Sequence, residues 1–138
     1  SNGDEVITLK GIKEALKEKS AEAIVIRTLP NLPEKQKKNY SATNPPYLAA
    51  DAMEYIVNKG FEHLLIDLPS VDREMDEGVL AAHHIFWNYP KAPNTQKTIT
   101  EFIFVSNEVA DGQYLLNMQA APFENDASPS RPILYKIK

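Results

Sequence analysis

Apolar residues recur at helical spacing in the first part of the chain, between Leu9 and Lys19. This spacing predicts a helix over that range, with Thr8 as its N-terminal cap. The segment from Glu22 to Thr28 is short and has β-branched residues at its centre, which predicts a buried strand. The long polar, proline-rich segment from Leu29 to Pro46 predicts a loop.

The same order of helix and strand then repeats. Asn44 followed by proline predicts the start of a second helix, and Gly60 predicts its left-handed end. The apolar run from His63 to Asp67 predicts a second buried strand. A third helix is expected from about Val79 to Trp87. Short strands are expected at Lys97–Val105, Tyr114–Met118 and Ile133–Ile137. Helices that alternate with short buried strands favour an α/β layer architecture.

Composition narrows the possible classes of protein. The chain has 138 residues, which suits one domain, and a net charge of −4, which argues against a surface that binds nucleic acid. Cysteine is absent, so disulfides, cysteine-ligated metals and thiol nucleophiles are excluded. The apolar runs are far too short for a membrane span. We therefore expect no nucleic acid and no membrane as partner.

Three polar residues follow the second strand directly: Asp67, Ser70 and Asp72. In α/β sheets, polar residues just beyond the carboxyl end of a strand line the ligand crevice. Alternatively, Asp67 and Ser70 build the turn through hydrogen bonds from side chain to backbone. Spacing alone leaves both interpretations open. Three lysines in the preceding loop, Lys35, Lys37 and Lys38, are interpreted as a solvated cluster rather than a phosphate site.

Two adjacent histidines and one glutamate are the other candidates. His83 and His84 point about 100° apart on a helix, so one can be a ligand or base while the other packs or faces water. Glu101 lies in an apolar strand, where a carboxylate is costly unless it is paired, metal-bound or turned toward solvent. Imidazole nitrogen and carboxylate oxygen both suit zinc or manganese.

An ordered set of segments resembles the putative cyclase family, which includes the bacterial kynurenine formamidases, metal-dependent hydrolases of N-formylkynurenine. The segments are Val25–Thr28, Asn44–Gly60, Leu65–Asp72, Ala82–Trp87, Thr98–Phe102 and Asp126–Pro132. Ala82-His83-His84 resembles the family's Ala-His-Arg helix, and the segment around Glu101 resembles its Ile-x-Glu-Asn-Leu strand. The fold that this resemblance implies is an α/β domain of the swivelling β/β/α type.

The resemblance also implies roles for individual residues. His83 and Glu101 match two metal ligands of the family, whereas His84 stands where the family has arginine and would not be a ligand. By this resemblance, the pocket would be lined by Asp67, Ser70 and Asp72, or these residues would orient the metal ligands by contacting them. The family's other ligands come from a His-x-Gly-Thr-His-x-Asp-x-Pro-x-His segment, which these 138 residues lack. The catalytic groups are expected in that segment, so the catalytic residues here are unknown.

The chain is accordingly expected to be part of a longer enzyme. Ser1-Asn2-Gly3 resembles a scar of tag cleavage, so residues 1–3 are expected to be a leader. Residues 4–138 are expected to be the C-terminal portion of a single cyclase-like hydrolase domain. The resemblance implies that the parent uses zinc or manganese to hydrolyse a small-molecule substrate, an amide, formamide or lactone. This part alone would bind metal weakly and be inactive. We expect a cytoplasmic location unless a native signal peptide has been removed. A homo-oligomer is a further expected partner state.

Two other interpretations stay open. The chain could be a non-catalytic binding or assembly module that keeps the cyclase scaffold without its metal centre. It could also be another α/β hydrolase or a sugar-binding domain in which the matches are accidental. The native sequence upstream of residue 4 would distinguish the first of these from the enzyme.

Overall fold

The structure, a computed structural model, describes residues 3–17 and 19–137. Ser1 and Asn2 of the expected leader lie outside the described residues, as does Glu18 near the expected end of the first helix. The chain divides into two units, residues 1–105 and 106–138, and each is described by itself.

A three-stranded parallel sheet is the centre of the first unit. Its order is β2 (Ala23–Ile26), β4 (His63–Ile66) and β5 (Thr98–Thr100), so β4 lies in the middle. A second, two-stranded parallel sheet pairs β1 (Val6–Ile7) with β3 (Tyr47–Leu48). Parallel strands that alternate with helices confirm the α/β class expected from the sequence.

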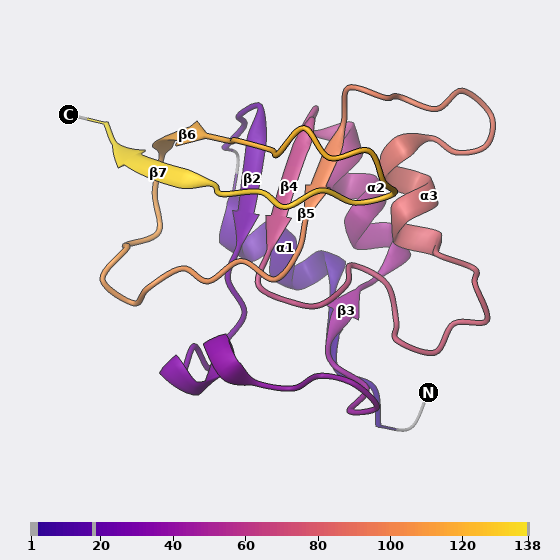
Figure 1. Ribbon diagram of the computed structural model, residues 1–138, viewed down its shortest axis with the longest axis horizontal. Coiled ribbons are helices and arrows are strands. Elements are labelled where there is room, and N and C mark those ends of the chain that lie inside the picture. The colour runs from indigo at the N-terminus through magenta and orange to yellow at the C-terminus, as the bar shows by residue number, and fades with distance from the viewer. Residues whose placement is uncertain (1–2, 18, 138) are drawn as a thin grey trace. The chain divides into compact units, whose positions relative to one another are not determined.

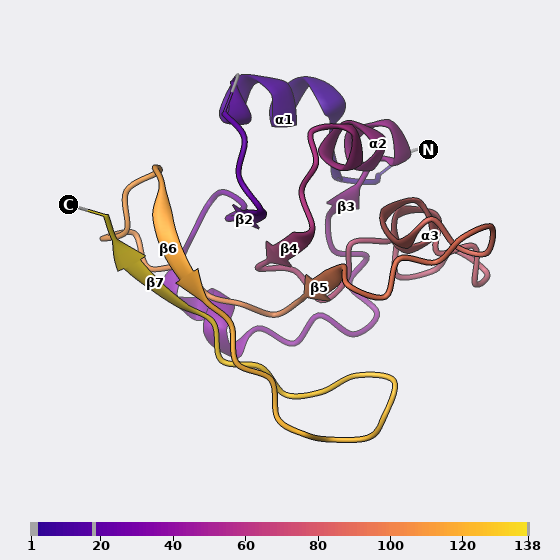
Figure 2. The same ribbon diagram turned by 90° about the horizontal axis from the view of Figure 1, so that it is seen from above.

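Three helices accompany the central sheet. Helices α1 (Leu9–Leu16) and α2 (Ala50–Asn58) lie along one of its faces, and α3 (Ala81–Trp87) packs beside α2 (Figure 2). The Thr8 hydroxyl accepts a hydrogen bond from the Gly11 amide at 3.2 Å, which confirms the expected cap of α1. None of the helices in the described part of the chain combines the length and apolar character needed to cross a membrane.

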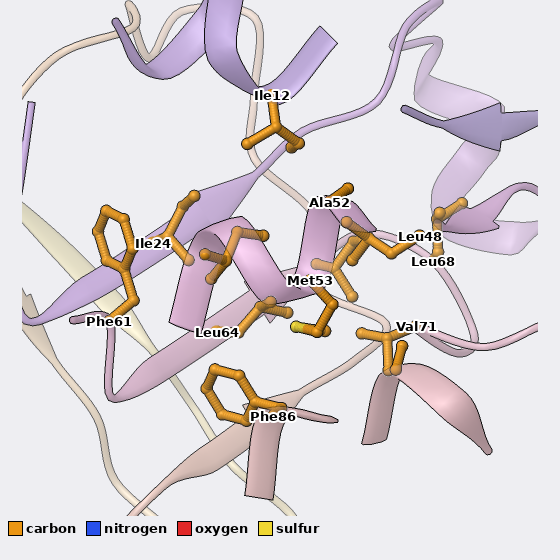
Figure 3. Packing of buried hydrophobic residues seen from close by; sticks show 13 residues of the cluster. Ile12, Ile24, Leu48, Ala52, Met53, Phe61, Leu64, Leu68, Val71 and Phe86 are labelled. Atoms are coloured by element: carbon orange, nitrogen blue, oxygen red, sulfur yellow. The ribbon is translucent and has the colours of Figure 1, made fainter. Parts of the chain in front are cut away.

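Apolar side chains from the sheet and the helices share one core (Figure 3). Leu64 from β4, Met53 from α2 and Phe86 from α3 are all at most 1% exposed and meet in this core. The other members of the cluster are Ile12, Ile24, Leu48, Ala52, Ile56, Phe61, Ile66, Leu68, Val71 and Ala82. This packing fixes α3 beside the carboxyl ends of β4 and β5, where the candidate site lies (Figure 1).

The expected start of the second helix is wrong. Asn44 has a positive φ of 48°, and α2 begins only after Ala49. The residues between them, Tyr47 and Leu48, form β3 and pair with β1. A local pattern cannot show this pairing because its partner strand lies far away in the sequence.

The expected strand Lys97–Val105 is only partly formed. Pairing with β4 ends at Thr100, and Phe102 has a positive φ of 56°. The chain nevertheless continues along the end of β4, since the Phe102 amide donates to the Leu68 carbonyl at 2.9 Å. Glu101 therefore lies at the point where the regular strand ends.

The second unit contains an antiparallel pair of strands. Strand β6 (Tyr114–Asn117) pairs with β7 (Ile133–Lys136), and Leu115 stands opposite Tyr135. The sequence predicts both strands, and each is one residue shorter at its end than expected. An isolated bridge between Ala120 and Ser130 extends the pairing.

Candidate metal centre

Polar residues stand at the carboxyl ends of all three strands of the central sheet. Thr28 follows β2, Asp67 follows β4 directly, and Glu101 follows β5 directly. Because the strands are parallel, these ends share one edge of the sheet (Figure 1). In open α/β sheets this edge is where ligands bind.

His83 lies between two carboxylates in the first turn of α3. Its Nδ1 is 2.6 Å from Oδ2 of Asp72, and its Nε2 is 3.6 Å from Oε1 of Glu101. Since an ionised carboxylate can only accept, the proton of this pair lies on Nδ1. Nε2 and the Glu101 carboxylate therefore face each other, and the structure brings together the two residues that match family ligands.

Asp72 also caps the helix that carries His83. Its carboxylate accepts from the Ala82 amide at 2.6 Å and from the His83 amide at 3.1 Å. Its own amide donates to the Ser70 hydroxyl at 3.0 Å. A carboxylate at a helix N-terminus satisfies free N–H groups and complements the helix dipole. One buried side chain thus fixes both the backbone and the ring of His83.

The Glu101 carboxylate is held by the loop that follows β4. Its Oε1 accepts from the Val71 amide at 3.0 Å, and the Ser70 hydroxyl also bonds to it. The side chain remains 27% exposed, against 17% for His83. The carboxylate is therefore positioned by the protein but still accessible from outside.

The two carboxylates change the protonation equilibrium of the imidazole between them. Burial favours neutral His83, but the hydrogen bond to Asp72 and the charges of Glu101 and Asp72 raise its pKa above 6.5. Burial by itself would raise the pKa of Asp72, but the hydrogen bonds from His83 and from the Ala82 amide bring it below 3.8. Burial raises the pKa of Glu101 above 4.5, despite the Val71 amide and His83. The site therefore favours positive charge at the imidazole.

Asp67 belongs to a different cluster. Its carboxylate accepts from the Thr28 amide at 3.0 and 3.1 Å, from the Thr28 hydroxyl at 2.9 Å and from the Lys35 ammonium at 2.7 Å. It also lines a cavity of about 170 Å³ together with Tyr40 and Phe102. Asp67 thus connects the ends of β2 and β4 and also faces a cavity. Ser70 instead hydrogen-bonds to Asp72 and Glu101.

The interpretation of the three lysines as a solvated cluster is wrong for Lys35. Its side chain is only 12% exposed, and its ammonium also donates to the Thr28 carbonyl and hydroxyl at 2.7 Å. The 3₁₀ helix η1 (Pro33–Lys37) turns Lys35 inward, while Lys37 and Lys38 stay exposed. Pro33, at the start of η1, is a local signal for such a turn. Nothing in the sequence pattern indicates Asp67 as the partner.

His83 and Glu101 fit a divalent metal as donors. Histidine ligands usually donate their other ring N–H to a carboxylate, as His83 does to Asp72. His84 instead packs against Tyr89, with ring centroids 4.8 Å apart and ring planes tilted by 39°. Within residues 3–17 and 19–137, no group of three or more His, Cys, Asp or Glu side chains is arranged to hold a metal ion. The described residues thus supply two donors that fit.

These features agree with the comparisons with known proteins. The family described as "Putative cyclase" matches residues 1–73, more than half of the chain, and the chain belongs to this family. Kynurenine formamidase of Bacillus anthracis is 34% identical over 93 residues, which cover 67% of this chain and 41% of that protein. The kynurenine formamidase of a Bacillus cereus strain matches to the same extent. The chain thus spans about two fifths of the length of these relatives.

Two solved structures share the fold. A potential metal-dependent hydrolase with cyclase activity superposes with a TM-score of 0.69 at 20% identity, covering 95% of this chain and 58% of that one. A structure described as a predicted metal-dependent hydrolase from Bacillus stearothermophilus gives a TM-score of 0.66 at 20% identity, covering 94% and 57%. The cyclase-like α/β fold expected from the sequence is therefore confirmed.

Proposed function

We propose that this chain forms part of a metal-dependent hydrolase of the kynurenine formamidase type, which cleaves an amide, formamide or lactone. The observation that carries the proposal is the approach of His83 Nε2 to Glu101 Oε1 at 3.6 Å, with Nδ1 held by Asp72. The family and the kynurenine formamidases that the chain resembles support it. A cytoplasmic location, a role in tryptophan catabolism and a homo-oligomer are further parts of this proposal.

Each residue of the site has a distinct task in this proposal. His83, through Nε2, and Glu101 would hold a divalent cation, zinc or manganese. When bound, such a cation lowers the pKa of a water molecule and polarises the substrate carbonyl. Asp72 fixes the tautomer and direction of the imidazole, and the Val71 amide fixes the carboxylate. The catalytic groups and the other ligands would come from a histidine-rich segment that these 138 residues lack, so the chain alone would bind metal weakly and have little activity.

Metal titration tests the ligand pair. We expect Zn²⁺ or Mn²⁺ to bind the chain weakly in isothermal titration, and His83→Ala and Glu101→Gln to abolish this binding. His84→Ala is the matched control, because His84 packs on Tyr89 rather than facing Glu101. Zinc or manganese affinities that are unchanged in His83→Ala and Glu101→Gln would contradict the proposal.

A non-catalytic module is the second candidate. It is favoured by the finding that the described residues contain no group of three or more metal donors. The native coding sequence upstream of residue 4 decides between the two. A His-x-Gly-Thr-His-x-Asp segment there supports the hydrolase, and a native start at this point supports the module.

A further inference from the structure

A small cavity lies beside the candidate metal centre, within the first unit. Its volume is about 170 Å³. Its lining comes from the end of β4, from the segment after β5 and from the region of η1. The lining residues are Lys35, Gln36, Lys38, Tyr40, Asp67, Phe102, Ile103 and Phe104. Since an apolar cavity of about 150 Å³ can hold benzene, this one is large enough for a single ring.

Aromatic residues contribute to the lining of the cavity. Tyr40 is 7% exposed and meets Phe102 edge to face, with ring centroids 6.2 Å apart. Phe102 remains 66% exposed although it is a large apolar residue. Its left-handed backbone, at a φ of 56°, is rare for a phenylalanine and is held by the hydrogen bond to Leu68. Strain of this kind concentrates at sites that bind or react.

The lining of the cavity also carries positive charge. Lys35 and Asp67 neutralise each other through their 2.7 Å ion pair. The Lys38 ammonium instead lies 4.9 Å from the centre of the Tyr40 ring. Within the described residues, no carboxylate lies in ion-pair distance of Lys38. The lining therefore carries one positive charge that no acidic side chain balances.

We propose that this cavity binds a small organic carboxylate, with its anionic group on Lys38 and an apolar group of about one ring against Tyr40 and Phe102. Phe102 follows Glu101 directly in the chain, so the cavity begins one residue beyond the candidate metal ligand. The inference rests on the proposed function in one respect: it takes the ligand to be the carboxylate-bearing part of the substrate. Lys38 and Phe102 are then specificity-determining residues.

Benzoate is the probe for this cavity. We expect it to bind the chain in an NMR titration, and to bind more tightly than neutral benzamide, than acetate, which lacks a ring, or than inorganic phosphate. Lys38→Gln should weaken benzoate binding about tenfold, the scale of one charge-assisted hydrogen bond. Lys37→Gln removes the same charge from an exposed position outside the cavity and should change nothing. Equal effects of the two lysine substitutions, or binding of benzamide or phosphate as tight as that of benzoate, would overturn the proposal.

A second variant tests the ring site without straining the fold. Phe102→Gly removes the ring, and glycine adopts the left-handed backbone freely. It should abolish the preference for benzoate over acetate, and a retained preference would overturn the proposal. Zinc titration of the unsubstituted chain and of His83→Ala, alongside the benzoate titration, separates the two hypotheses. If the unsubstituted chain does not bind benzoate but His83→Ala abolishes zinc binding, only this inference is refuted. If benzoate binds as expected but His83→Ala leaves the zinc affinity unchanged, only the proposed hydrolase function is refuted.

Discussion

Asp72 holds His83 at two points, through the backbone amide at 3.1 Å and through the ring Nδ1 at 2.6 Å. From within the loop that joins β4 to α3, this one carboxylate therefore caps α3 and orients the imidazole. Leu80, at the cap position of α3, makes no side-chain hydrogen bond to the helix, so Asp72 takes over that task from the preceding loop. The stability of α3 and the orientation of the proposed metal ligand His83 are thereby coupled through one buried residue.

Substitution of Asp72 should affect both properties. We expect Asp72→Asn to lower the free energy of unfolding by about 1–3 kcal/mol, because buried groups lose charge-assisted hydrogen bonds. Zinc affinity should fall about 10–100-fold, the usual effect of removing a carboxylate behind a histidine ligand. Urea unfolding and isothermal titration measure the two effects. Glu77→Gln removes an exposed charge from the same loop as a control. An Asp72→Asn chain that matched this control in both measurements would disprove the coupling.

The pH dependence of stability should report on His83 in the metal-free chain. Despite burial, which favours the neutral ring, Asp72 and Glu101 raise the pKa of His83 in the folded state above 6.5. The folded chain therefore binds the proton more tightly than the unfolded chain does. This stabilisation is complete below the ordinary pKa and is lost as the pH rises through the folded value. Thermal unfolding midpoints, measured with a chelator present, should fall over that range. His83→Gln should remove this decrease in the unfolding midpoint, whereas His84→Gln should retain it. A decrease that persists in His83→Gln would show that another group causes it.

The start of α1 offers a test of local structure that is independent of the site. Thr8→Ala should cost about 1 kcal/mol of stability, because the Gly11 amide loses its side-chain acceptor. Thr8→Ser keeps a hydroxyl and should cost much less. Chemical denaturation of both variants measures the difference. Equal losses would mean that the threonine acts through its methyl group rather than its hydrogen bond.

Elements that depend on local pattern could be predicted from the sequence. The cap at Thr8, the end of α2 at Gly60 and the strand β4 all follow from neighbouring residues, whose spacing and backbone preferences act within one or two turns. The short strand β3 could not be predicted, because Tyr47 and Leu48 are strand residues only through β1. Two-residue strands carry too little pattern of their own.

The candidate site, too, can be predicted from the sequence only in part. Histidine at 83 and glutamate at 101 were candidates because of their residue types and the family resemblance, but no spacing rule brings a helix and a strand end within 3.6 Å. That approach depends on the core that packs α3 against the sheet. The burial of Lys35 cannot be predicted for a related reason: its loop is polar, and its partner Asp67 lies beyond β3, α2 and β4 in the sequence.

The ion pair between Lys35 and Asp67 should be the most sensitive polar contact of the fold. The Asp67 side chain is only 1% exposed, so removing its cation leaves a buried charge with the Thr28 hydrogen bonds alone. Breaking one side of a buried pair typically costs 3–5 kcal/mol, and we expect a loss of about 3 kcal/mol for Lys35→Met. Lys37→Met, two residues away on the same 3₁₀ helix, should cost less than about 0.5 kcal/mol because Lys37 is exposed. Urea unfolding of the two variants compares them directly. Similar midpoints would show that solvent or another cation stabilises Asp67 in place of Lys35. A large difference would confirm that Lys35 holds the ends of β2 and β4 together.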